Sequence, residues 1–144
     1  MRVAAILLGA MLAALTCLPA AAIDPGTGPT LDEARVHVEN ENWPMAVREL
    51  KRVVADAPED PDALNLLAYA LRHTGDSENA RGFYLKALSI DPDHLGANEY
   101  LGELHVALGE REAAEARLVR IAEICGNRSC EAYVDLAAAI AAAP

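Results

Sequence analysis

A pattern of small and apolar residues recurs at a spacing of about 34 residues and limits the folds open to this chain. It is clearest in residues 61–94, where apolar residues return at helical spacing in two stretches. Gly75 suits the left-handed residue that ends a helix, and Asp76 or Ser77 can cap the next one. The first stretch carries Leu64, Leu67, Ala68 and Leu71, and the second carries Ala80, Phe83, Tyr84, Ala87 and Leu88. Each unit is therefore predicted to be a helical hairpin.

Prolines mark the limits of the units. Pro58, Pro61 and Pro92 lack a backbone donor and restrict the residue before them, so helices must begin or end there. The pattern is weaker before Pro61, and it continues after Pro92 as far as Gly126. Hairpins this short cannot bury an apolar face alone, so neighbouring units must stack. The predicted repeats are residues 27–60, 61–94 and 95–126.

Two positions in every unit carry small residues. The eighth position holds Ala34, Ala68 and Gly102, and the twentieth holds Ala46, Ala80 and Ala114. We expect the two helices of each hairpin to cross at close range at these positions. A leucine in place of Ala80 would overpack the crossing, at a cost of about 1–3 kcal/mol.

Residues 61–94 resemble a tetratricopeptide repeat (TPR) unit. The resemblance is carried by Leu64, Leu67, Ala68, Leu71, Gly75, Ala80, Tyr84, Ala87 and Pro92. It implies an all-α fold, in which three TPR helical hairpins stack as a short right-handed solenoid. A capping helix and tail are expected over residues 127–144, after the last repeat. Without its N-terminal segment, the chain is similar to small exported TPR proteins of Gram-negative bacteria.

The N-terminus has the pattern of a secretory signal peptide. Arg2 is followed by an uncharged apolar run, by Pro19 and by small residues up to Ala22. We expect residues 1–22 to be cleaved near Ala22, residues 23–30 to be a short linker, and the protein to reach the periplasm. An uncleaved membrane anchor is the main alternative, although the run is shorter than the ~20 residues of a spanning helix. Lipidation at Cys17 is a third reading.

The charge of the chain limits its partners. The full sequence has 12 basic and 22 acidic side chains, for a net charge of −10. Cleavage near Ala22 would remove Arg2 and no acidic residue. Such an acidic protein is a poor ligand for nucleic acid or for an anionic membrane. Solubility alone also accounts for acidity of this kind.

Two cysteines remain beyond the predicted signal peptide. Cys125 and Cys130 lie where the third repeat ends, and export to an oxidising compartment favours a disulfide between them. The bond would hold the capping helix against the third repeat. A thiol-redox pair is an alternative that the four intervening residues disfavour, and no ligand spacing indicates a metal site. In the capping helix we expect Tyr133, Leu136, Ala137 and Ile140 to cover Leu118 and Ile121, with Glu131 and Asp135 facing solvent.

The TPR resemblance places a binding groove on the concave face formed by the first helices of the repeats. The residues it implies are Arg35, Asn65, Tyr69, Arg72 and His73 as a mildly cationic middle, with Glu99 and Glu103 as an acidic end. Amide and guanidinium groups can hydrogen-bond a peptide backbone or a terminal carboxylate. Asn65 and Tyr69 are the strongest candidates, since solubility needs neither. The alternative is that these are ordinary solvated residues.

The predicted function is a non-catalytic scaffold or adaptor that binds a peptide or helix of a cell-envelope protein. The sequence has no phosphate-binding loop, nucleophile elbow or zinc-protease motif, and no cofactor or metal is predicted. After signal cleavage no membrane contact is expected. One alternative is a self-associating module, a homodimer formed through an outer face of Trp43, Pro44 and Met45. The other is the thiol-redox protein.

Overall fold

The computed structural model describes residues 28–144; residues 1–27, which contain the predicted signal peptide and most of the predicted linker, lie outside the described part. Within residues 28–144 there are seven α-helices and no strand. The helices are α1 (Leu31–Glu39), α2 (Trp43–Asp56), α3 (Pro61–His73), α4 (Ser77–Ile90), α5 (Leu95–Ala107), α6 (Arg111–Cys125) and α7 (Glu131–Ala142). No helix in this part of the chain has both the length and the apolar character needed to cross a membrane.

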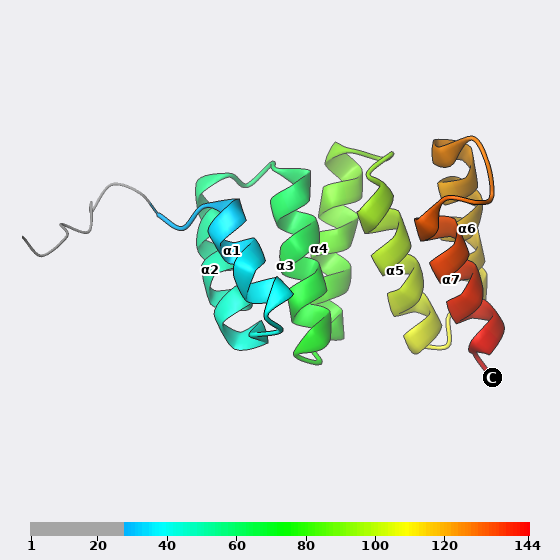
Figure 1. Ribbon diagram of the computed structural model, residues 1–144, viewed down its shortest axis with the longest axis horizontal. Helices are drawn as coiled ribbons and strands as arrows, with labels where there is room; N and C mark the ends of the chain where they lie inside the picture. Colours follow the sequence, from blue (N-terminus) through cyan, green and yellow to red (C-terminus); the bar gives the residue numbers. More distant parts are fainter. Residues whose placement is uncertain (1–27) are drawn as a thin grey trace, which may run out of the picture.

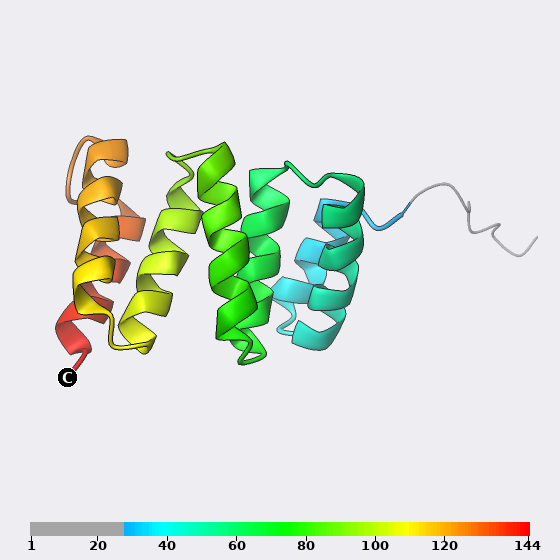
Figure 2. The same cartoon turned by 180° about the vertical axis from the view of Figure 1, so that it is seen from behind.

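The helices are arranged in two layers. Helices α1, α3, α5 and α7 form the layer that faces the viewer in Figure 1, and α2, α4 and α6 form the layer that faces the viewer in Figure 2. Consecutive helices pack as the hairpins α1/α2, α3/α4 and α5/α6, and α7 packs against both α5 and α6. The structure therefore confirms the predicted all-α fold of stacked helical hairpins.

Local signals in the sequence begin and end these helices. Thr30 and Glu33 form a reciprocal capping box at the start of α1. The side chain of Asp60 accepts hydrogen bonds from two backbone amides of α3, and that of Asp76 accepts one from the Asn79 amide of α4. Gly75 has a φ of +86°, the left-handed conformation expected between the two stretches. The predicted hairpin of residues 61–94 thus has the expected turn and cap.

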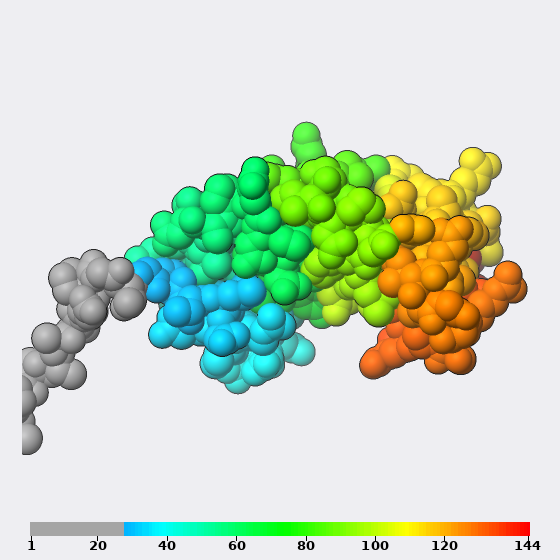
Figure 3. All heavy atoms as spheres, turned by 90° about the horizontal axis from the view of Figure 1, so that it is seen from above, coloured from blue at the N-terminus to red at the C-terminus, as the bar shows by residue number. Residues whose placement is uncertain are grey.

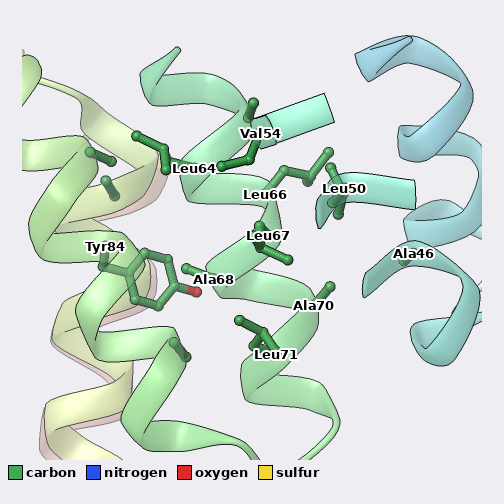
Figure 4. Close-up of a cluster of buried hydrophobic side chains, with 14 of the residues drawn as sticks. Ala46, Leu50, Val54, Leu64, Leu66, Leu67, Ala68, Ala70, Leu71 and Tyr84 are labelled. Atoms are coloured by element: carbon green, nitrogen blue, oxygen red, sulfur yellow. The ribbon is translucent and has the colours of Figure 1, made fainter. Parts of the chain in front are cut away.

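The apolar core consists of two clusters. The larger one extends from α1 to α5, and the smaller one joins α5, α6 and α7. In the larger cluster the fully buried ring of Tyr84 lies beside Ala68 (Figure 4), so the small residue at the eighth position leaves room for an aromatic ring from the second helix. Leu50, Leu64 and Leu67 are also fully buried in this cluster.

Gly102 lies at the expected close crossing with α6 and has a second, tighter neighbour on α7. A Cβ atom on Gly102 would lie 2.5 Å from Cδ2 of Leu136, which belongs to α7, and 3.3 Å from Cβ of Arg117 on α6. Leu136 is fully buried. The tightest approach at this position is therefore made by the capping helix.

Helix α7 covers the end of the third repeat largely as predicted. Ala132, Leu136 and Ile140 are buried, with Leu118, Ile121 and Tyr133 in the same cluster, while Ala137 is only half-buried. Cys125 is the last residue of α6 and Cys130 precedes α7. Their sulfur atoms lie within bonding distance and their Cα atoms are 6.4 Å apart, as the predicted disulfide requires.

Candidate functional site

The two layers curve, so that one side of the molecule is hollow. Viewed from above, the blue segment near α1 and the orange segment between α6 and α7 project toward the same side (Figure 3). The hollow side belongs to the layer of α1, α3, α5 and α7. Within it a pocket of about 420 Å³ lies between α3, α5 and α7. The pocket is lined by Tyr69, Arg72, Leu95, Glu99, Tyr100, Glu103, Glu131, Ala132 and Asp135.

A line of aromatic rings leads to this pocket from the N-terminal end. The ring of Trp43, at the start of α2, stacks on His73 with centroids 4.1 Å apart and planes within 10°. His73 is 4.6 Å from the Tyr69 ring, and Tyr69 is 4.7 Å from Tyr100. Edge-to-face and offset ring pairs at such distances are favourable. These four residues, which we call the aromatic ladder, connect three consecutive repeats.

Arg72 is engaged within the molecule. Its Nη1 forms a salt bridge with Oε2 of Glu103 at 2.7 Å, and the two side chains are only 20% and 26% exposed. Its guanidinium carbon also lies 5.4 Å from the centroid of the Tyr69 ring and 5.9 Å from that of Tyr100, within the range of a cation–π contact. The positive charge expected in the middle of the groove is therefore balanced by Glu103.

His73 adds no positive charge near neutral pH. Partial desolvation of the imidazole, which stacks on Trp43, lowers its pKa below the ordinary value, and the neighbouring Arg72 charge lowers it further. The predicted cationic middle is therefore wrong for the centre of the groove, because Arg72 is ion-paired and His73 is neutral.

Glu99 is the most perturbed acid in the pocket. Burial raises the pKa of its carboxyl group to about 7, and the nearby charges of Glu103, Asp135 and Glu131 contribute in the same direction. Arg72 opposes the shift but does not cancel it. Glu99 therefore changes its charge near neutral pH, whereas an ordinary glutamate does so near pH 4.3.

The predicted site residues do not all come together. Tyr69, Arg72, Glu99 and Glu103 line the pocket, and His73 adjoins it through the Tyr69 ring. Arg35 is exposed on α1 and does not line the pocket.

Asn65 was expected to be exposed and is instead buried between α3 and α5. Asn65 is 9% exposed, and its side-chain Oδ1 has no hydrogen-bond partner in the described part of the chain. Its Nδ2 lies 3.3 Å from the position that a Cβ on Gly96 would occupy. Asn65 therefore forms part of the packing between helices and is absent from the pocket wall.

Five residues of the pocket lining were missed: Leu95, Tyr100, Glu131, Ala132 and Asp135. Tyr100 carries the aromatic ladder onto α5. Glu131 and Asp135 are exposed, as expected for the outer side of a cap, and they also line the pocket. Helix α7 occupies the place of a further first helix in the stack. Its start lies within two residues of the place that the 34-residue period counted from Leu95 gives.

Trp43 packs against the neighbouring repeat. Packing of Trp43 against a neighbouring helix was the leading expectation, and only the self-association alternative placed it on an outer face with Pro44 and Met45. The Trp43 ring packs on His73 and meets Tyr69 edge-on, with centroids 5.9 Å apart. The aromatic surface assigned to a homodimer thus belongs to the ladder that leads into the pocket.

Stacked helical hairpins with a hollow, side-chain-lined face define a helical repeat protein of the solenoid class. Residues 31–94 match the family profile described as tetratricopeptide repeat. Residues 31–94 therefore form a tetratricopeptide-repeat region. No match was found among curated proteins.

Solved structures show the same fold. MamA from Desulfovibrio magneticus RS-1 is 23% identical, with a TM-score of 0.63, and the match covers 69% of this chain but only 56% of that one. The type III secretion chaperone SycD of Yersinia enterocolitica, solved with a peptide of the translocator YopD, is 16% identical, with a TM-score of 0.70 and coverage of 77% and 86%. The TPR2B domain of yeast Sti1, solved in a pHsp70 complex, is 24% identical, with a TM-score of 0.66 and coverage of 76% and 94%.

Proposed function

We propose that this protein is a non-catalytic scaffold that binds a peptide or helix of another protein on its hollow face. The observation that carries the proposal is the continuity of the aromatic ladder with the 420 Å³ pocket. Aromatic side chains provide large contact areas at a small entropy cost, and pockets of about 300–1,000 Å³ are typical binding sites. SycD and Sti1 TPR2B, which share the fold, were each solved in complex with a partner.

We place this scaffold in the periplasm, where it would act as an adaptor for a cell-envelope protein. The signal-peptide pattern of residues 1–22 supports export, as does the proximity of the two cysteine sulfurs. Fusion of the whole chain to alkaline phosphatase, which is active only after export, tests the location. An inactive fusion, compared with an active one that carries a known signal peptide, would contradict it.

The binding function is tested by capture from periplasmic extract. A Tyr69→Ala, Tyr100→Ala double variant removes the two rings that border the pocket, and it is compared with the unmodified protein. The matched control is Leu85→Ala, Val119→Ala, which truncates two exposed side chains on the opposite layer. Circular dichroism establishes that all three are folded.

We expect the unmodified protein and the control to retain the same partner and the ring variant to lose it. A partner retained equally by all three proteins would place binding elsewhere and contradict the proposal. Chemical cross-linking of the retained partner, followed by mass spectrometry, then identifies the segment in contact with α3, α5 and α7.

A further inference from the structure

The carboxyl groups that line the pocket outnumber the basic side chains that line it. Four carboxyl groups line it, and Arg72 is the one basic side chain among its lining residues. Arg72 pairs with Glu103, whereas Glu99, Glu131 and Asp135 form no ion pair within residues 28–144. Like charges held close together destabilise each other, and an incoming cation relieves this repulsion.

Arg72 shows how this pocket receives a cation. Its guanidinium lies over the rings of Tyr69 and Tyr100 and pairs with the Glu103 carboxylate at 2.7 Å. Aromatic faces next to a carboxylate are a favourable environment for guanidinium and ammonium groups. The wall opposite Arg72, formed by α7, presents Glu131 and Asp135 without such a partner.

We propose that the bound segment carries a lysine or arginine side chain, which enters the pocket between α5 and α7 and pairs with Glu99 and Asp135 beside the Tyr100 ring. This inference rests on the proposed function and specifies the partner chemistry of the same site. The 420 Å³ of the pocket accommodates a long side chain together with adjoining backbone. The aromatic ladder then contacts the apolar residues next to that basic residue.

Binding of such a cation is linked to pH through Glu99. The groups that face it are Glu103 on its own helix, Glu131 and Asp135 on α7, and Arg72 on α3. The pKa of Glu99 is about 7 in the free protein, and a cation beside it favours the ionised form. Binding therefore releases a proton below about pH 7, and affinity for a basic segment rises from pH 6 to pH 8, by about tenfold if Glu99 is fully ionised in the complex.

The experiment uses three immobilised pools of random peptides of about twelve residues, long enough to span several pockets of an extended binding site. The pools differ only in the central residue, which is lysine or arginine, glutamate, or alanine. Retention of the purified protein is compared with that of a Glu99→Gln, Asp135→Asn variant. The matched control is Glu78→Gln, Glu112→Gln, which removes the same number of carboxyl groups at exposed residues of α4 and α6.

We expect the basic pool to retain the protein best, and the pocket variant to bind that pool about tenfold more weakly, since the loss of close charge pairs costs on the order of 1.4 kcal/mol. The control is expected to keep the preference. Equal retention on all pools, or an equal loss in the pocket variant and the control, would overturn the basic-segment inference while leaving peptide binding intact. Retention on no pool would overturn the proposed function together with the inference.

Discussion

At the scale of single residues, two helical glycines in this protein have opposite surroundings. Gly82 in α4 is exposed, and a Cβ there would meet no atom within 4 Å. A Cβ on Gly102 in α5 would meet the buried Leu136 side chain at 2.5 Å. Backbone entropy favours alanine over glycine in both helices, but only Gly102 has a packing reason to lack a side chain.

We therefore expect Gly82→Ala to raise the free energy of unfolding by about 1 kcal/mol. Gly102→Ala should lower it by about 1–3 kcal/mol, because Leu136 must leave its packed position. Urea denaturation at a single pH measures both values. A Gly102→Ala variant as stable as Gly82→Ala would mean that Leu136 moves aside freely and that α7 does not depend on this contact.

Glu99 gives a second prediction at this scale. Its pKa is raised from 4.5 to about 7, so between these pH values the folded protein binds more protons than the unfolded chain. The free energy of unfolding therefore falls as pH rises through this window. Glu99→Gln removes the loss, and the variant is expected to be more stable than the unmodified protein at pH 8 and about equally stable at pH 5. Urea midpoints at the two pH values provide the measurement.

Glu110 does not affect the comparison of Glu99→Gln with the unmodified protein between pH 5 and pH 8, because the pKa of Glu110 is shifted downward. Hydrogen bonds from Arg81 and His105 hold it at about 2, so its stabilising effect is complete above about pH 4.5 and is lost only in stronger acid. Glu112→Gln on α6 is the control for removing a charge outside the pocket. If Glu99→Gln and Glu112→Gln change the pH profile alike, the repulsion assigned to the pocket is absent.

At the scale of elements, α7 has two roles. Leu136 and Ile140 cover the core of the third repeat, while Glu131 and Asp135 form one wall of the pocket. Cys130 immediately precedes this helix and meets Cys125 at the end of α6. The position of the pocket wall is therefore coupled to the short loop that the two cysteines close.

Opening this loop should loosen α7. A Cys125→Ser, Cys130→Ser variant is expected to lose about 2 kcal/mol of stability in the loop-entropy model. Hydrogen exchange in α7 should accelerate relative to α3, since α7 has only the smaller core cluster to hold it. The oxidised protein treated with a reductant should behave like the variant, and the variant itself should not respond. Unchanged exchange in α7 would show that packing alone positions the helix.

The parts of this structure that follow from local rules could be predicted from the sequence. The turn at Gly75, the cap at Asp76 and the proline-bounded hairpins depend on residues close together in the chain. The pairing of Arg72 with Glu103 depends on how far α5 is rotated against α3, which the repeat period does not specify. The wall formed by α7 was missed because Glu131 and Asp135 were considered only as the solvent-facing side of a cap, whereas they also line the pocket.

At the scale of the whole molecule, the two core clusters divide the stack unequally. The larger cluster joins five helices, and the smaller one joins the third repeat to α7. In a solenoid each unit contacts only its neighbours, so stability is close to a sum of unit and interface contributions. The pocket lies where the two clusters meet, since α3 belongs to the larger cluster and α7 to the smaller.

Equivalent leucine truncations in the two core clusters should accelerate hydrogen exchange in different sets of helices. Leu67→Ala in α3 and Leu136→Ala in α7 each remove a fully buried leucine side chain, at a cost of about 2–5 kcal/mol. Leu67→Ala should accelerate hydrogen exchange throughout α1 to α5, because every hairpin there packs on the larger cluster. Leu136→Ala should accelerate it in α6 and α7 while leaving α1 to α4 protected. If both variants accelerate exchange in all helices alike, the stack unfolds as one cooperative unit, and a partner bound at the pocket would then stabilise the first repeat as strongly as the last.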